Sequence, residues 1–336
     1  MTEMLLNGSI LPLAFAALMG IAILAYVILD GYDLGIGMLM ADADRAERDR
    51  MIATIGPFWD ANETWLVLGI GLLLVAFPMA HGMVLTALYL PVAIMLLGLT
   101  LRGVAFEFRV KAPVPHQVWW DRTFVAGSTL AALMQGYMLG KYVMGFGGGW
   151  QAEIFAVLAA GGLAGAYMFV GSTWLVAKTD GALQARAVRW ARRTLVLTMA
   201  GMLVISVATP LVSPRIFERW FSFPNLIMLA PIPLMTGAVF VALKVFLARM
   251  PRVDHSLDFV PFLGAMSLFV LGFCGLAYSF YPYVVPERLT IVQAAAAPES
   301  LLVILVGTVF VLPFIIAYTA FSYFVFRGKA SELHYY

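Results

Sequence analysis

The sequence is poor in charged residues, histidine and cysteine. Charged side chains make up 12% of its 336 residues, four residues are histidine, and Cys274 is the single cysteine. Soluble domains carry about a quarter of their residues as charged side chains, so this composition is that of a membrane protein. One cysteine excludes an internal disulfide, a thiolate zinc site and a cysteine-ligated iron-sulfur cluster. The net charge of +2 gives no indication of nucleic-acid binding.

Hydrophobic residues are abundant instead, at 62% of the chain. A helix that crosses a bilayer needs about 20 mostly apolar residues, and the first run is much too long for a signal-peptide core. We therefore predict an all-α polytopic protein that forms a single integral membrane domain over residues 1–336. Nine apolar runs are long enough to span: 10–40, 57–77, 83–101, 123–143, 152–177, 194–212, 226–247, 261–281 and 301–326.

Lys and Arg in the connecting loops predict the orientation of these spans, because basic loops stay in the cytoplasm. If the nine spans alternate in direction, all but four of the 21 basic residues lie on one side. The four on the other side are Lys141, Arg215, Arg219 and Arg288. We therefore expect the N terminus outside and the C terminus in the cytoplasm, which requires an odd number of spans.

Acidic residues stand at the cytoplasmic ends of the first two predicted spans. The stretch PFWDANETWLV carries Asp60 and Glu63 on one helical face, and LDGYDLGIGML carries Asp30 and Asp33. A charge at membrane depth is costly, so such groups face protein or water, are paired, or are protonated. Glu107 lies nearby in the third loop.

Two readings of these acids stay open. The carboxylates either pair with arginines such as Arg102 and Arg109 to fix helix ends, or carry protons inward from the cytoplasmic face. We favour the pairing reading for Asp33, at the edge of the hydrocarbon. For the deeper Asp60 and Glu63 we favour a function in proton transfer.

Histidine placement bears on cofactors. The four histidines, His81, His116, His255 and His334, all fall in loops or in the tail. A membrane haem normally needs an axial ligand within a span, and histidine is the commonest. We therefore expect no haem, other cofactor or metal bound directly by this chain. Glycine pairs inside the spans indicate helix contacts, and the small-residue spacing of Gly31 and Gly35 predicts that another helix approaches the first span closely there.

Taken together, LDGYDLGIGML, PFWDANETWLV and LRGVAFEFR resemble subunit II of cytochrome bd-type quinol oxidases, and the nine spans extend the resemblance over essentially the full length. The second motif is closer to the cyanide-insensitive branch. The resemblance implies a fold of two four-helix bundles plus one extra helix.

The resemblance also implies a setting and a reaction. The chain would be the haem-free member of a heterodimer in the bacterial cytoplasmic (inner) membrane, with two b-type haems and a haem d or third b-type haem on subunit I. The complex would oxidise quinol, reduce oxygen to water and be electrogenic without pumping protons. A small single-span accessory subunit and a bound structural quinone or lipid are further candidates.

Individual residues carry over at matching positions. Asp60 and Glu107 match positions of a cytoplasmic proton pathway, and Trp65 matches a tryptophan beside an oxygen-access route. Asp30 and Asp33 belong to the family signature, as structural or proton-path residues. Glu63 departs from the better-known branch, where an amide is expected, so it is a further candidate for the proton path or for local pairing.

Two other classes of function compete with this reading. A proton-coupled secondary transporter would use Asp60 and Glu63 as its coupling pair, but such folds show paired interrupted helices around a midplane site. No such pair stands out in this sequence. A purely structural scaffold is the third hypothesis, and it predicts that changing Asp60 leaves turnover intact.

Overall fold

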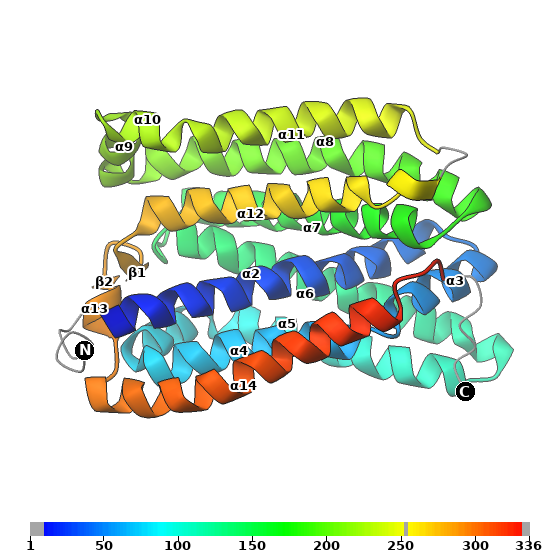
Figure 1. Cartoon of the computed structure of the whole chain (residues 1–336), viewed down its shortest axis with the longest axis horizontal. Helices are drawn as coiled ribbons and strands as arrows, with labels where there is room; N and C mark the ends of the chain where they lie inside the picture. Colours follow the sequence, from blue (N-terminus) through cyan, green and yellow to red (C-terminus); the bar gives the residue numbers. More distant parts are fainter. Residues whose placement is uncertain (1–9, 252–254, 331–336) are drawn as a thin grey trace. The chain divides into compact units, whose positions relative to one another are not determined.

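The chain is almost wholly helical (Figure 1). The computed structural model describes residues 10–251 and 255–330. The long helices are α2 (Ile10–Leu39), α4 (Trp59–Ala76), α5 (Pro78–Lys111), α6 (Gln117–Val143), α7 (Trp150–Lys178), α8 (Gly181–Val212), α11 (Pro231–Ala248), α12 (Val260–Phe280) and α14 (Pro298–Val325). The shorter elements are η1 (Met40–Asp42), α3 (Arg45–Ile55), η2 (Val114–His116), α9 (Pro214–Phe221), α10 (Asn225–Leu229), η3 (His255–Leu257), α13 (Ile291–Ala294) and an antiparallel hairpin of β1 (Tyr283–Val285) and β2 (Leu289–Thr290).

Within the described residues, eight helical segments are long and apolar enough to cross a membrane, which confirms a polytopic all-α membrane protein. Helix α6, over the predicted span 123–143, is not among the eight. It is long enough, but Ser128, Thr129 and Gln135 make it less apolar than its neighbours. The count of nine spans therefore stays a prediction, and the chain ends that define the predicted orientation, residues 1–9 and 331–336, lie outside the described residues.

Two helices continue well beyond the predicted apolar runs. Helix α8 begins at Gly181 rather than near residue 194, and α5 continues to Lys111 rather than ending near residue 101. The extra turns carry arginines such as Arg102, Arg109 and Arg186. Hydropathy marks only the part of a helix that suits hydrocarbon, whereas backbone hydrogen bonding continues the helix into the polar region.

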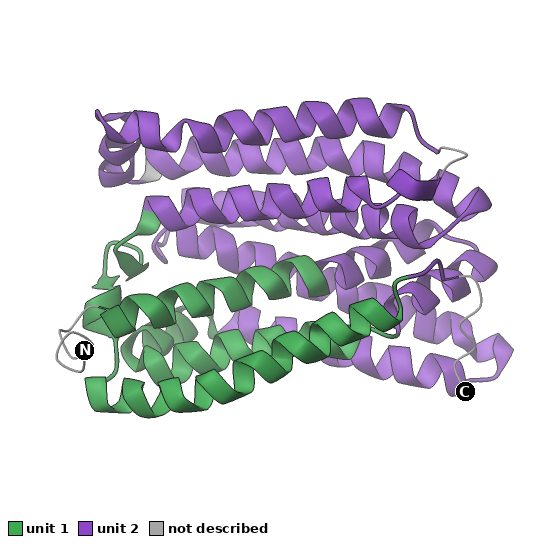
Figure 2. Ribbon diagram, viewed as in Figure 1, with its two compact units in different colours: residues 1–30, 57–89, 280–327 green, residues 31–56, 90–279, 328–336 purple. Residues whose placement is uncertain are grey.

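The chain forms two compact units (Figure 2). Unit 1 comprises residues 1–30, 57–89 and 280–327, and unit 2 comprises residues 31–56, 90–279 and 328–336. Both are discontinuous in sequence, because α2 and α5 each contribute one part to unit 1 and one part to unit 2.

Unit 1 is built around α4, the first part of α2 and α14. Its core contains Ala22 and Tyr26 of α2 together with Trp65 of α4, and Leu312 and Ile315 of α14 pack against them. Helices α4 and α14 run in opposite directions: the start of α14 meets the end of α4, where the backbone N–H of Ala296 donates to the carbonyl of Ala76 at 2.8 Å. At the other end, the rings of Phe58 and Tyr323 pack against each other with centroids 4.6 Å apart and planes tilted by 33°.

Unit 2 depends on close helix contacts at glycine. A Cβ atom on Gly35 of α2 would overlap the backbone carbonyl of Tyr167 on α7, and one on Gly31 would lie 2.7 Å from the Tyr167 ring. On α7, a Cβ on Gly171 would lie 2.8 Å from the carbonyl oxygen of Tyr32. The predicted close approach at Gly31 and Gly35 is therefore confirmed, and α7 is the helix that approaches.

A buried ion cluster joins α3, α5 and α6 in unit 2. The Asp121 carboxylate, which is almost inaccessible, accepts from Nε of Arg109 at 2.5 Å and from Nη1 of Arg48 at 3.4 Å. Arg109 also donates through Nη2 to Asp49 at 2.6 Å. The pairing reading is thus wrong for Arg109, because its ion-pair partners are Asp121 and Asp49. None of the predicted site carboxylates belongs to this cluster.

Gly35→Ala should destabilise the protein, because the new methyl group has no space beside the Tyr167 carbonyl. Overpacking of this kind costs about 1–3 kcal/mol. We expect a lower midpoint of thermal unfolding for the purified protein. Gly71→Ala on α4 is the matched control, since a Cβ there meets no atom within 4 Å. Equal midpoints for the two variants would contradict the close contact.

Asp121→Asn should lower the free energy of unfolding more than replacement of an exposed acid does. Removing one member of a buried ion pair costs about 3–5 kcal/mol, because the remaining charge stays buried without compensation. Asp180→Asn is the control: Asp180 pairs with Arg50 at 3.6 Å while 49% of its side chain is exposed, so its loss should cost less than about 1 kcal/mol. Thermal unfolding of both variants measures the difference, and similar losses would show that the cluster is not a stabilising element.

Candidate functional site

Asp60 lies in the first turn of α4. This helix begins at Trp59, and the buried side chain of Phe58 just before it is held by the rings of Tyr323 and Phe326 in α14. Asp60 itself is exposed on this chain. Its negative charge is favourable there, because the N-terminal end of a helix carries a partial positive charge. The structure therefore places Asp60 at an accessible helix end rather than deep inside the chain.

Glu63 follows Asp60 by one helical turn on α4 and is half-buried. The two carboxylates thus lie at different depths along one helix. Asp60 is exposed on this chain, whereas Glu63 is partly enclosed by it. Each can bind and release a proton.

Asn62, between the two acids in sequence, is fully buried. Its side-chain N–H donates to the carbonyl of Leu29 in α2 at 3.2 Å, and its Oδ1 accepts from the hydroxyl of Tyr323 in α14 at 3.1 Å. One amide therefore ties three helices of unit 1 together. Sequence reasoning missed Asn62 and Tyr323. The sequence does place the amide of Asn62 on the opposite side of the helix from the two acids, which could have indicated a separate role for it. Nothing in the sequence indicated that Tyr323 is its partner.

Asp30 and Asp33 are both buried in the protein, one turn apart on α2. The sequence suggested that Asp33, near the edge of the hydrocarbon, would avoid most of the cost of desolvation. The structure shows instead that only 1% of Asp33 is exposed. Asp30 follows Leu29 directly, so it lies beside the backbone carbonyl that binds Asn62. Both acids interact with neighbouring groups.

Glu107 lies near the end of α5 and is exposed, with its Oε2 atom 3.9 Å from Nζ of Lys111. Two residues further on, Arg109 fixes this end of α5 to Asp121 of α6. Glu107 belongs to unit 2 and Asp60 to unit 1, and each is placed only within its own unit.

Trp65 is buried in the core of unit 1. Its neighbours are Ala22 and Tyr26 in the buried cluster, with Leu312 and Ile315 of α14 packed against them. Most of this environment is apolar. It is a setting in which a small apolar molecule dissolves more readily than in water.

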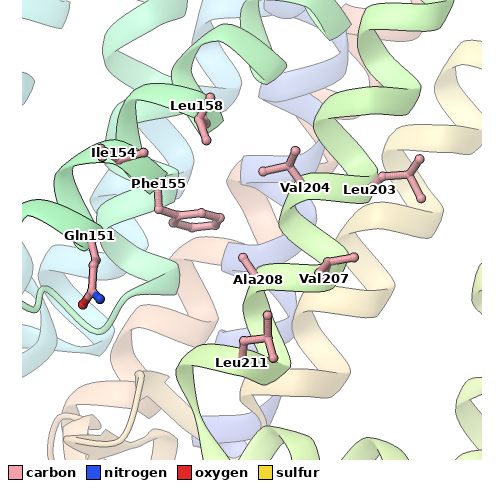
Figure 3. Close-up of a pocket in the computed structure, with 9 residues that line it drawn as sticks. All are labelled: Gln151, Ile154, Phe155, Leu158, Leu203, Val204, Val207, Ala208 and Leu211. Carbon is pink, nitrogen blue, oxygen red and sulfur yellow. The ribbon is translucent and has the colours of Figure 1, made fainter.

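Among the described residues, no three His, Cys, Asp or Glu side chains are grouped to hold a metal ion. A groove of about 450 Å³ lies between α7 and α8 (Figure 3). It is apolar apart from one amide, and its lining residues include no histidine, methionine or cysteine. They are Gln151, Ile154, Phe155, Leu158, Leu203, Val204, Val207, Ala208 and Leu211.

Comparison with solved structures finds the same fold in the structure of bd oxidase from Geobacillus thermodenitrificans. The TM-score is 0.72 at 18% identity, and the match covers 91% of this chain and 96% of that chain. At this level of identity the similarity concerns the fold.

Among curated proteins, the chain is similar to cytochrome bd ubiquinol oxidase subunit 2 of Bacillus subtilis. They are 29% identical, over 94% of this chain and 95% of the relative. It is also 25% identical to cytochrome bd-I ubiquinol oxidase subunit 2 of Escherichia coli, over 98% of this chain and 97% of that protein. The similarity thus runs over nearly the whole length of each relative.

The family model described as cytochrome bd terminal oxidase subunit II matches residues 11–326, which include every candidate site residue. Its match runs from the first turn of α2 to the end of α14. With its apolar helices and these relatives, the chain is a multi-pass protein of the bacterial inner membrane and belongs to the cytochrome bd terminal oxidase subunit II family.

Proposed function

We propose that this chain is the haem-free subunit of a quinol oxidase that reduces oxygen to water, and that it contributes structure and a cytoplasmic proton pathway. The observation that carries the pathway is the exposed Asp60 at the start of α4, next to a buried polar connection through Asn62. The complex is electrogenic because its chemical protons come from the cytoplasm, and it does not pump.

The partner in this proposal is subunit I, which binds two b-type haems and a third haem of d or b type, and the substrates are quinol and oxygen. The positions of the histidines support the placement of the haems on the partner. His81 lies in the first turn of α5, so the prediction that it falls in a loop was wrong. His116 and His255 are exposed in short helical turns, and Nδ1 of His255 lies 2.9 Å from Asp258. His334 lies outside the described residues. The α7–α8 groove suits an apolar chain, which supports a bound lipid or structural quinone. A small accessory subunit belongs to the same proposal.

The proposed topology has nine spans, with α6 as the ninth, an outer N terminus and a cytoplasmic C terminus. The 27 residues of α6 are about 40 Å long, enough to cross the hydrocarbon. Its polar Gln135 is satisfied inside the protein, because Oε1 accepts from the Tyr167 hydroxyl at 2.6 Å. In this proposal the two units form one membrane domain, arranged as two four-helix bundles and an extra helix.

The proton path begins, in this proposal, at the exposed carboxylates Asp60 and Glu107. Glu63 is a store for protons one turn further along α4. The buried Asp30 and Asp33 on α2 are further members of the path, and the Leu29–Asn62 hydrogen bond connects the backbone beside Asp30 to α4. Carboxylates suit this task because they exchange protons readily, and burial keeps the path separate from lipid.

Trp65 marks an oxygen-access route in the same proposal. The apolar side chains around its ring favour dissolved oxygen over water. The transporter alternative is disfavoured, because the family match and the relatives cover nearly the whole chain and all are oxidase subunits.

Asp60→Asn should slow oxygen reduction by about tenfold or more while the haem content stays unchanged. The amide keeps the size of the side chain but cannot release a proton, and groups that transfer protons contribute about 10²–10⁴ in rate. Turnover is measured on the complex purified through this chain from native membranes, after its haem bands and second large subunit have been verified.

Glu299→Gln is the control for Asp60→Asn, because Glu299 is an exposed acid in the first turn of α14 and lies outside the proposed path. Its turnover should equal that of the unchanged complex. Normal turnover in a fully assembled Asp60→Asn complex would contradict the proton path. A colourless, solitary chain from intact membranes would contradict the oxidase assignment itself.

Trp65→Ala should change the rate at which oxygen rebinds after flash photolysis of the reduced complex. If oxygen passes the Trp65 ring, removing the ring alters the packing along the route and slows productive access by about two- to tenfold, the equivalent of about 0.4–1.4 kcal/mol. Trp119→Ala is the control, since Trp119 is exposed at the start of α6. Unchanged rebinding in Trp65→Ala would mean that oxygen enters elsewhere.

A further inference from the structure

A polar stretch interrupts the apolar contact between α4 and α14 in unit 1. On α14, Leu312, Ile315, Thr319 and Tyr323 follow one another at spacings of three or four residues and therefore share one face. Leu312 and Ile315 pack against the Trp65 cluster, and Tyr323 donates to Asn62. The face is thus apolar in its first half and polar in its second.

Thr319 lies at the level of Trp65 along this contact. The helices are antiparallel, and Tyr323 of α14 is hydrogen-bonded to Asn62 of α4. Thr319 precedes Tyr323 by one turn of α14, which is about 6 Å along the helix axis. Trp65 follows Asn62 by one turn of α4, which is about 4.5 Å along the axis. Both steps go in the same direction.

Each of these two residues has a buried polar atom that lacks a partner within the described part of the chain. The atoms are Nε1 of Trp65 and Oγ1 of Thr319. Leaving a buried donor or acceptor unsatisfied is costly, and native proteins rarely do so. This chain itself covers both atoms, so neither subunit I nor a lipid can reach them from outside. Whatever satisfies them lies inside the contact between the helices.

We propose that the contact between α2, α4 and α14 binds a buried water molecule, held by the indole N–H of Trp65 and the hydroxyl of Thr319. Water fits both atoms because it accepts from the indole and can either donate to or accept from the threonine hydroxyl. Buried waters typically have about three polar partners and satisfy groups that the protein leaves unpaired. The contact is closely packed and mainly apolar, and its two polar atoms do not require a ligand larger than water.

This water gives the polar stretch a role, which rests on the proposed proton path. Asn62 cannot take up and release a proton as a carboxylate does, so a proton that moves from Asp60 further along α4 must pass this amide. The hydroxyls of Tyr323 and Thr319 and the bound water each both donate and accept hydrogen bonds. They provide a way past the amide, and the Tyr323 hydroxyl, which is bonded to Asn62, is the first group in it.

The direct test is a structure of the intact complex at a resolution that shows ordered water, for the unchanged protein and for Thr319→Val. We expect density about 3 Å from both Nε1 of Trp65 and Oγ1 of Thr319. Valine has the shape of threonine without its oxygen, so this density should be lost or displaced in the variant. A dry contact in the unchanged protein, or each atom bonded to protein alone, would overturn the water site.

The second test compares Tyr323→Phe with Tyr318→Phe, a tyrosine on the same helix that is 51% exposed. We expect Tyr323→Phe to slow turnover about five- to tenfold at unchanged haem content, which converts to about 1–1.4 kcal/mol. The loss should grow as the pH rises and the solvent isotope effect should increase, because proton supply becomes limiting. Tyr318→Phe should leave turnover, pH profile and isotope effect unchanged.

The outcomes separate this inference from the proposed function. A slower Tyr323→Phe complex with an unaltered pH profile and isotope effect would overturn the relay and leave a structural hydrogen bond. Water density together with normal turnover in Asp60→Asn would reject the proton path while the water site stands. A dry contact with slow Asp60→Asn turnover would reject only the water site.

Discussion

The structure depends on one constraint: a polar group within the membrane must find its partner inside the protein, because hydrocarbon offers none. In the long helices, the backbone N–H and C=O groups are hydrogen-bonded to each other within the same helix. Their few polar side chains are satisfied across helices, as Gln135 is by Tyr167 and Asn62 is by Leu29 and Tyr323. Each such bond fixes the relative rotation of two helices, since turning either one by a residue would leave both groups unpaired.

Apolar packing alone would specify these contacts weakly, because the surrounding lipid is as apolar as leucine. Small residues supply the shape that distinguishes one helix pair from another. Gly35 lets α2 reach the backbone of α7, and Gly136 and Gly140 let α6 approach Ala160 and Ala156. Polar bonds and glycine contacts therefore serve the same end: they select a partner and a register where hydrophobicity cannot.

The sequence correctly predicted those features that depend on a local pattern of residues. The length of the apolar runs predicted the helices, the Gly31–Gly35 spacing predicted a close helix contact, and three short motifs indicated the family. Long-range pairing was out of reach: Asn62 and Tyr323 are 261 positions apart, and Asp121 pairs with Arg48 across 73. Helix ends were predicted wrongly, because an apolar run ends where charged residues begin although the helix itself continues. Helix α8, for example, begins at Gly181, well before its apolar run. The exposure of Asp60 and the burial of Asp33 depend on neighbouring helices, which periodicity does not specify.

The division of the chain between its two units has a consequence for biogenesis. Most of unit 2 comes from one continuous stretch, residues 90–279, whereas unit 1 needs residues from both ends of the chain. Synthesis proceeds from the N terminus, so Tyr323, the partner of Asn62, leaves the ribosome after the stretch 90–279 of unit 2. The early helices must therefore wait in the bilayer with this amide unmatched by Tyr323. Helix α14 completes unit 1, so a chain cut short before α14 lacks the element that binds this amide.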